Sequence, residues 1–257
     1  MSALQEKILD HYRAEASKHG LEGTSTIQDI RTRRLEMDAI FSYLYDGIQV
    51  LEVGCGNGYV AEALVREFNV DLHAIDLSKD LIGLAQRRDL SGARGRVRFE
   101  QADVLAPVNL AQYDLIFTER CIQNLLCWVD QQVALANIAR ALRPGGEFIM
   151  LESFHTGKDQ LNAARKELDL PEIAQPWHNV WFDEEATKDH LAGLGCRYVD
   201  QNRFLSGYYF GSRVLLPALM PEGRPVTSNS VLNDYFCSLP PHGDFCPMKI
   251  LRFRKDF

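Results

Sequence analysis

Short apolar runs recur along the chain, and stretches with helical periodicity separate them. Seven runs occupy residues 48–53, 71–76, 96–100, 113–118, 147–151, 197–199 and 248–253. Runs of this length that end at polar residues or glycine are typical of buried strands. Their alternation with helical segments predicts an α/β fold with a doubly wound sheet.

Helical spacing also marks the segments around these runs. Before the fifth run it appears at Leu135, Ile138 and Leu142, and Arg143-Pro144-Gly145-Gly146 ends it. Before the first run it appears twice, at Leu4, Ile8 and Tyr12 and again at Leu35, Ile40 and Leu44. We therefore expect two N-terminal helices ahead of the sheet, and a further helix beginning near Asp183.

The first strand leads directly into a glycine-rich turn. Residues 47–58 read GIQVLEVGCGNG, so Gly54, Gly56 and Gly58 occupy alternate positions. Glycine lets the backbone turn sharply and approach a ligand, and the helix that follows begins with free N–H groups. This pattern predicts a nucleotide-binding turn.

The spacing of the turn bears on which nucleotide binds. The dinucleotide fingerprint places its third glycine where this chain has Tyr59, so NAD and an oxidoreductase function are disfavoured. Glu52 in the preceding strand would repel a pyrophosphate and suits a cationic ligand better.

Polar residues close the next three strands. Asp76 lies 22 residues after Gly54, the distance at which a doubly wound fold delivers an acid to a ribose. Asp103 ends the third strand. Glu119 and Arg120 follow the fourth, at the edge that faces the reaction centre in open α/β sheets.

Residues 50–58, VLEVGCGNG, resemble the first motif of the class I S-adenosylmethionine-dependent methyltransferases, and the Leu-Arg-Pro-Gly-Gly stop at 142–146 adds to the likeness. The resemblance covers roughly residues 45–200. It implies a seven-stranded Rossmann-like sheet, with S-adenosylmethionine as cofactor and S-adenosylhomocysteine as product. The cofactor contacts that we expect are Glu52, Gly54, Cys55, Gly56, Gly58, Asp76, Leu77, Asp103, Val104, Thr118, Glu119 and Arg33.

A closer likeness lies in residues 118–120, 176–179, 208–213 and 239–245, which look like bacterial methyltransferases encoded with surface-polysaccharide assembly genes. It suggests O-methylation of a small polar acceptor such as a sugar, a glycan terminus or a sugar-linked phosphate. The alternatives are a small-molecule N- or carboxyl methyltransferase and a non-catalytic cofactor-binding partner subunit.

A hydroxyl acceptor has to lose a proton. His178 is the first candidate base because imidazole titrates near neutral pH, whereas Glu152 would need a raised pKa; His155 is a further candidate. An anionic acceptor needs no base, and Arg120 with Arg213 would then clamp it.

Aromatic residues outside the core are the candidate acceptor contacts. Trp177 lies between Pro176 and a second tryptophan, and Tyr208, Tyr209 and Arg213 lie in a late insertion. We expect these four residues to bind the acceptor, with packing inside the insertion as the alternative.

The chain is expected to form one domain, since no linker or repeat divides its 257 residues. Its parts are N-terminal helices (1–47), a cofactor-binding core (48–153), a substrate-side loop (154–182), the end of the sheet (183–205 and 246–257) and an insertion (206–245) that caps the substrate.

Charge, cysteine content and apolar stretches limit the kinds of partner, metal site and location that we expect. A net charge of −7 disfavours nucleic acid, and 118–121 lack the Asn/Asp-Pro-Pro-aromatic tetrad typical of base N-methyltransferases. Six cysteines without a Cys-x-x-Cys pair give no support for a metal site. With no signal peptide or membrane-length apolar stretch, we expect a cytoplasmic monomer or homodimer.

Overall fold

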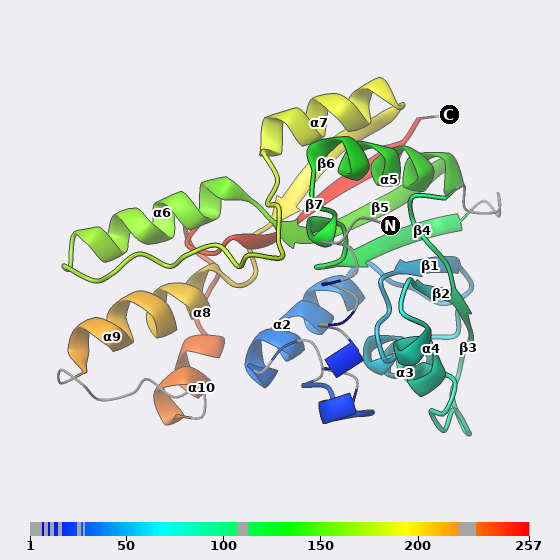
Figure 1. The fold of residues 1–257 in the computed structure, drawn as a ribbon, viewed down its shortest axis with the longest axis horizontal. Coiled ribbons are helices and arrows are strands. Elements are labelled where there is room, and N and C mark those ends of the chain that lie inside the picture. Colours follow the sequence, from blue (N-terminus) through cyan, green and yellow to red (C-terminus); the bar gives the residue numbers. More distant parts are fainter. Residues whose placement is uncertain are drawn as a thin grey trace.

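The computed structural model describes residues 7, 10, 13–14, 17–24, 27, 29–106, 113–220 and 230–256. Its sheet has the strand order β3-β2-β1-β4-β5-β7-β6 (Figure 1). The strands are β1 (Gln49–Val53), β2 (Asp71–Asp76), β3 (Arg96–Gln101), β4 (Tyr113–Glu119), β5 (Leu142–Ser153), β6 (Cys196–Asn202) and β7 (Met248–Lys255). Only β7 runs antiparallel to its neighbours, β5 and β6. The seven-stranded, doubly wound α/β class is confirmed.

Helices cover both faces of the sheet (Figure 1). One face carries α2 (Ile30–Phe41), α3 (Tyr59–Glu67) and α4 (Lys79–Ala85), and the other carries α5 (Trp128–Ala141) and α7 (Glu184–Gly193). Alternate strand residues serve the two cores: Leu115 and Phe117 of β4 face α2 and α3, whereas Ile116 faces α5. Burial on both faces explains why these strands read as continuous apolar runs.

The strand register determines which residues meet at the carboxyl edge of the sheet. Val53 of β1 pairs with Ile75 of β2 on one side and with Thr118 of β4 on the other. The three strands therefore end at the same level, and the residues that follow them meet there. The strand order also reverses between β1 and β4, the place where open α/β sheets bind ligands.

A second group of helices lies beside the sheet, on the left of Figure 1. It contains α6 (His155–Lys166), α8 (Ser206–Phe210), the π-helical turn η2 (Gly211–Leu215), α9 (Leu216–Leu219) and α10 (Val231–Cys237). Helices α8, α9 and α10 share a small core that includes Tyr208, Leu216 and Phe236.

Some expected elements differ from those observed. The expected loop at 154–182 is wrong over 155–166, where α6 forms; its buried positions are Gly157, Leu161 and Arg165, so an apolar pattern could not show them. Leu142 begins β5 instead of ending a helix. The N-terminal pattern at Leu4, Ile8 and Tyr12 falls outside the described residues.

Within those described ranges, no helix is long and apolar enough to cross a membrane.

A buried lysine joins the helical group to the sheet. The Nζ atom of Lys249, on β7, lies 2.7 Å from Oε1 of Glu184, 2.5 Å from Oδ2 of Asp244 and 3.0 Å from Oγ1 of Thr156. Its side chain is fully buried. One cation thus holds together the starts of α6 and α7 and the end of the insertion.

Replacing Lys249 should strongly destabilise the fold. In Lys249→Met the volume is nearly kept but Glu184 and Asp244 lose their cation, so the free energy of unfolding should fall by about 3–5 kcal/mol. Urea denaturation followed by circular dichroism measures this. Lys79→Met, on the exposed surface of α4, is the control and should change stability little. Equal stability of the two variants would contradict this role of Lys249 in joining the helical group to the sheet.

Candidate functional site

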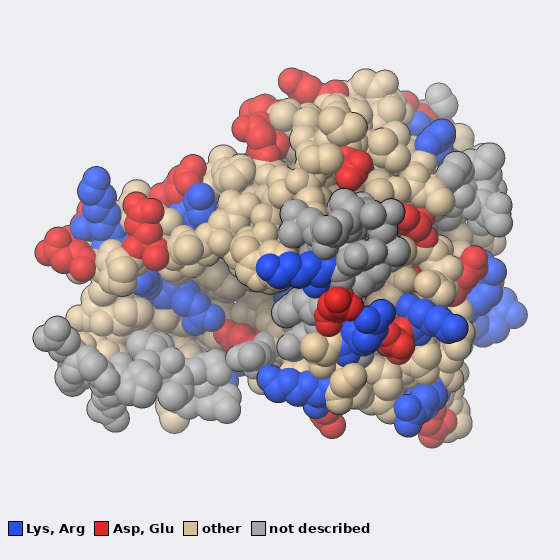
Figure 2. All heavy atoms as spheres, viewed as in Figure 1, with Lys and Arg blue, Asp and Glu red and all other residues tan. Residues whose placement is uncertain are grey.

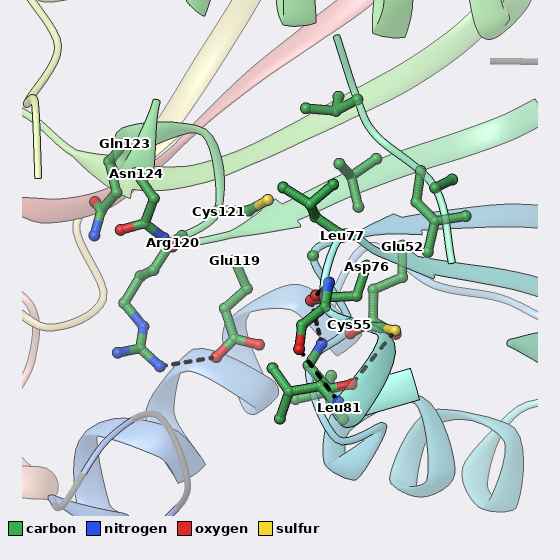
Figure 3. Close-up of a pocket in the computed structure, with 18 of the residues that line it drawn as sticks. Glu52, Cys55, Asp76, Leu77, Leu81, Glu119, Arg120, Cys121, Gln123 and Asn124 are labelled. Carbon is green, nitrogen blue, oxygen red and sulfur yellow. Dashed lines mark hydrogen bonds and ion pairs between the residues drawn. The ribbon is translucent and has the colours of Figure 1, made fainter. Parts of the chain in front are cut away.

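A cavity of about 400 Å³ opens at the carboxyl ends of β1, β2 and β4. Its walls come from the turn after β1, the ends of β2 and β3, the segment after β4, and residues 178–179. Figure 3 shows Cys55 and Asp76 at one side of this cavity and Gln123 and Asn124 at the other, with Glu119 between them.

The glycine turn and Asp76 form one hydrogen-bonded unit. The Gly56 N–H donates to Oδ2 of Asp76 at 2.9 Å, and the Ser78 N–H donates to Oδ1 at 2.8 Å. Gly56 has φ +54°, and a β-carbon on it would meet no atom within 4 Å. The backbone here borders open space, so a ligand can approach it closely.

The other two glycines serve packing. A β-carbon on Gly54 would collide with the Cys121 side chain. One on Gly58 would lie 2.9 Å from Ala85 and Phe99 atoms, and Gly58 does not line the cavity. The missing side chain of Gly58 makes room for α4 and β3, and this packing gives no support to the ligand contact that was expected there.

Most of the other expected cofactor residues line the cavity. They are Glu52, Cys55, Leu77, Asp103, Val104, Glu119 and Arg33. Thr118 is fully buried in the sheet and is not among them. Burial raises the pKa of Glu52 well above its ordinary value. The raised pKa weakens the attraction for a cation that the sequence suggested for Glu52.

Charged residues of α2 and β4 form a buried network. Arg33 of α2 pairs with Glu119. Arg120 lies with Nε 3.1 Å from Oε1 of Glu36 and with Nη2 3.9 Å from Oε1 of Glu119, the latter contact dashed in Figure 3. Arg120 also has φ +52°, a conformation that costs a non-glycine residue energy and that clusters at functional sites.

The two carboxyl groups of this network titrate differently. Burial raises the pKa of Glu36 to about 8, because its nearest cation, Arg120, compensates only in part. Burial also opposes ionisation of Glu119, but Arg33 and Arg120 outweigh it and lower the pKa of Glu119. Glu119 is therefore the ionised partner and Glu36 the protonated one at pH 7.

His178 reaches the cavity because its segment is tied to the turn after β4. The Val180 N–H donates to the Gln123 carbonyl oxygen at 2.7 Å, and Gln131 Nε2 donates to the Val180 carbonyl oxygen at 2.7 Å. His178 and Asn179 thereby lie in the wall with Arg120.

Two candidate bases do not reach the cavity. Oε1 of Glu152 accepts the N–H groups of Cys121 and Ile122, at 3.1 and 3.0 Å, and Oε2 accepts that of Gln123 at 3.2 Å. Burial raises the pKa of Glu152 to about 7, but its oxygens hold the turn. His155, at the start of α6, lies against Trp181. Neither residue lines the cavity, so the geometry of this site gives no support to either of them as the base.

The expected acceptor contacts also lie elsewhere. The Tyr208 hydroxyl donates to Oδ2 of Asp29 at 2.7 Å, and Nη2 of Arg213 donates to the same oxygen at 3.0 Å. Trp177 is 52% exposed. None of these lines the cavity, and neither does Tyr209. Asp29 also caps α2, so Tyr208 and Arg213 secure the helix that carries Arg33.

Sequence reasoning missed several residues at this site, among them Glu36, Gln123, Asn124 and Asn179. Glu36 lies one helical turn from Arg33, but their burial within a polar helix has no signature in an apolar pattern. The part of the chain that the structure describes contains no cluster of three or more His, Cys, Asp or Glu suited to a metal ion.

Comparison with known proteins agrees with this geometry. Residues 50–146 match the family model described as a methyltransferase domain. The chain is 38% identical over 103 residues to an uncharacterized methyltransferase, YdaC, of Bacillus subtilis strain 168, an alignment covering 39% of this chain and 54% of that protein. It is 28% identical over 162 residues to the ubiquinone biosynthesis O-methyltransferase of Salmonella enteritidis PT4, an alignment covering 58% of this chain and 65% of that protein.

The fold extends the likeness along the whole chain. Magnesium protoporphyrin IX methyltransferase (ChlM) of Synechocystis PCC 6803, solved with bound SAH, superimposes with a TM-score of 0.61 over 97% of this chain and 95% of that one, at 14% identity. The curated relatives match over only 54% and 65% of their own lengths. The likeness is thus to methyltransferases, in the sequence of residues 50–146 and in the fold of nearly the whole chain.

Gly56→Val should abolish tight cofactor binding. The new side chain would enter the open space beside Asp76, so affinity for S-adenosylhomocysteine should fall by at least about tenfold in calorimetry. Gly92→Val is a matched control, because Gly92 also has positive φ and open space but does not line the cavity. Both variants bear similar backbone strain. Equal affinities in the two would contradict the assignment of the turn.

The raised pKa of Glu36 predicts a pH-dependent stability. Between pH 4.5, its ordinary pKa, and about pH 8, Glu36 keeps a proton in the folded state that it loses in the unfolded state. The contribution of Glu36 to the free energy of unfolding therefore falls as the pH rises, by at most about 1.4 kcal/mol per pH unit. Glu36→Gln removes this loss. Urea unfolding at pH 6, 7 and 8 should show the variant gaining on the wild type, whereas exposed Glu185→Gln should not. Parallel pH profiles of stability for the wild type and Glu36→Gln would refute this prediction.

Proposed function

We propose that the chain transfers a methyl group from S-adenosylmethionine to a hydroxyl oxygen of a small polar acceptor. The observation that carries the proposal is that one cavity joins the glycine turn and Asp76 to a polar wall containing Arg120 and His178. The relative named as a ubiquinone biosynthesis O-methyltransferase supports oxygen as the methylated atom.

The cofactor half of the cavity fits the donor. Gly56 would allow close approach, Asp76 retains lone pairs for ribose hydroxyls beyond those that accept the two N–H groups, and Asp103 would meet the adenine. Arg33, paired with Glu119, would face the cofactor's amino-acid end. When bound, S-adenosylmethionine supplies a methyl carbon whose bond to sulfur breaks with its electron pair left on sulfur.

The polar half would prepare the acceptor. His178 is the base that the structure favours, since Glu119 is committed to two guanidinium groups and neither Glu152 nor His155 lines the cavity. In the proposed reaction the acceptor O–H bond breaks, its proton passes to the imidazole, and its oxygen forms the bond to the methyl carbon. The buried walls exclude water and hold the two partners close.

A sugar, a glycan terminus or a sugar-linked phosphate is the proposed acceptor type, on the strength of the likeness to enzymes encoded with polysaccharide assembly genes. The net charge of −7 argues against RNA and DNA as acceptors, and on the face shown in Figure 2 acidic side chains lie among the basic ones. We further propose that residues 206–245 act on the acceptor side through α2, because Tyr208 and Arg213 hold Asp29 at its start.

His178→Ala should lower kcat/KM for a hydroxyl acceptor roughly a hundredfold while leaving affinity for S-adenosylhomocysteine unchanged. The assay follows labelled methyl transfer to methyl glycosides, nucleotide sugars, small acids and RNA. Exposed His242→Ala is the control. The acidic limb of the pH–rate profile should disappear in His178→Ala alone. A near-wild-type rate would remove His178 as base, and preferential labelling of RNA would overturn the proposed acceptor class.

A further inference from the structure

A glutamine lies on the buried face of α5, outside the cavity. Gln131 is only 1% exposed and shares this face with Ala134, Leu135 and Ile138, which belong to the core on that side of the sheet. It does not line the cavity. A buried amide costs free energy unless it is hydrogen-bonded, so the partners of Gln131 indicate what it does.

The side-chain nitrogen of Gln131 contacts three backbone carbonyl oxygens. Nε2 donates to that of Val180 at 2.7 Å and lies 3.5 Å from those of Ile122 and Leu125. These contacts fix the orientation of the amide, since only its nitrogen can donate to a carbonyl. The nitrogen carries two hydrogens, so one serves Val180 and the other faces the turn after β4. Gln131 therefore joins that turn to the segment that carries His178.

Both of the joined segments form part of the cavity wall. Gln123 and Asn124 line the cavity from the turn after β4 (Figure 3), and His178 and Asn179 line it from the other segment. The Val180 N–H donates to the Gln123 carbonyl oxygen at 2.7 Å. Val180 is therefore held at its N–H by the turn and at its carbonyl by Gln131, two residues from His178.

Other hydrogen bonds of this segment do different work. The Asn179 N–H donates to the Pro176 carbonyl oxygen at 3.1 Å, and Gln175 Nε2 donates to the Asn179 carbonyl oxygen at 2.7 Å, so both bonds lie within the segment. The Phe182 N–H donates to the Ser153 carbonyl oxygen at 2.9 Å and anchors the far end to β5. The bonds of Val180, by contrast, cross to the turn and to α5 next to His178.

Small displacements at this place would matter for proton transfer. A general base has to lie within about 2.6–3.2 Å of the atom whose proton it takes, and a misplacement of about 1 Å can lower the rate on the order of a hundredfold. The glycine turn and Asp76, which form the cofactor side, belong to other segments of the wall. Loss of the Gln131 bond should therefore affect methyl transfer and leave cofactor affinity nearly unchanged.

We infer that Gln131 is a positioning residue for methyl transfer, which holds the segment of His178 against the turn after β4 so that the imidazole meets the acceptor hydroxyl. The acceptor proton passes to His178, and Gln131 itself touches neither the acceptor nor the cofactor. This inference rests on the proposed function and adds to it a residue that lies outside the cavity.

Matched variants of two neighbouring glutamines test the inference. Gln131→Met keeps the length of the side chain but removes its donor. Gln132→Met makes the same change at the next residue, whose Nε2 lies 3.4 Å from Nδ1 of His190 and which does not line the cavity. Each change is also made in the His178→Ala background. Labelled methyl transfer to the methyl glycoside that the wild type uses fastest gives kcat and KM, calorimetry gives the affinity for S-adenosylhomocysteine, and amide hydrogen exchange reports on residues 176–182.

We expect Gln131→Met to lower kcat by about tenfold or more and to speed hydrogen exchange in residues 176–182 by at least about tenfold. Its affinity for S-adenosylhomocysteine should stay within about threefold of wild type, as should every measurement on Gln132→Met. In the His178→Ala background, Gln131→Met should lower kcat by less than about twofold further, because no imidazole is left to position.

Wild-type kcat or unchanged hydrogen exchange in Gln131→Met, with a slow His178→Ala, would overturn this inference alone. An equal fall in kcat with and without His178 would also overturn it, because Gln131 would then act by another route. A near-wild-type His178→Ala, or no transfer by the wild type to any methyl glycoside, would instead refute the proposed function and the inference with it.

A folding defect has its own test. If Gln131→Met does not bind S-adenosylhomocysteine, Gln131→Asn takes its place, because its amide is one methylene too short to reach the Val180 carbonyl oxygen and the same results are expected. Failure of both variants to bind S-adenosylhomocysteine would assign Gln131 to the stability of the fold and overturn its positioning role.

Discussion

Parallel pairing of β1 with β2 and β4 is the constraint on which the rest of the site depends. Val53 stands opposite both Ile75 and Thr118, so the glycine turn, Asp76 and Glu119 leave the sheet at one level. The Gly56 N–H can then reach Asp76 at 2.9 Å. A shift of one residue in either pairing would turn these side chains to the opposite face and dismantle the cavity wall.

Helix α2 transmits the arrangement of the late insertion to this wall. Its cap, Asp29, accepts hydrogen bonds from Tyr208 and Arg213 of the insertion, and Arg31 pairs with Asp234 of α10. One turn further along, Arg33 pairs with Glu119 in the cavity. A segment nearly two hundred residues away in sequence thus helps to set the position of a guanidinium group in the wall. Tyr208 and Arg213, which the sequence suggested as acceptor contacts, instead support the helix that carries Arg33.

Four glutamates in or near the cavity wall differ in pKa because their surroundings differ. Glu119 has two guanidinium neighbours, which lower its pKa, whereas burial with less compensation raises the pKa of Glu36 to about 8 and that of Glu52 well above its ordinary value. Glu152 is buried as well, but its oxygens accept three backbone N–H groups and so shape the turn that presents Asn124. The charge and role of each carboxyl group follow from its neighbours.

The amino-acid sequence alone determined the strand pattern, the turn at Gly54, Gly56 and Gly58, and the placement of Asp76 and Asp103 at strand ends, because these are local features with a fixed period or spacing. It could not show that His178 lines the cavity while Glu152 and His155 do not, nor assign Tyr208 and Arg213 to Asp29. Those outcomes depend on contacts between segments far apart in the chain. Only the tertiary structure decided which polar side chains face the cavity and which ones hold it together, since burial and hydrogen-bond partners are properties of the packed molecule.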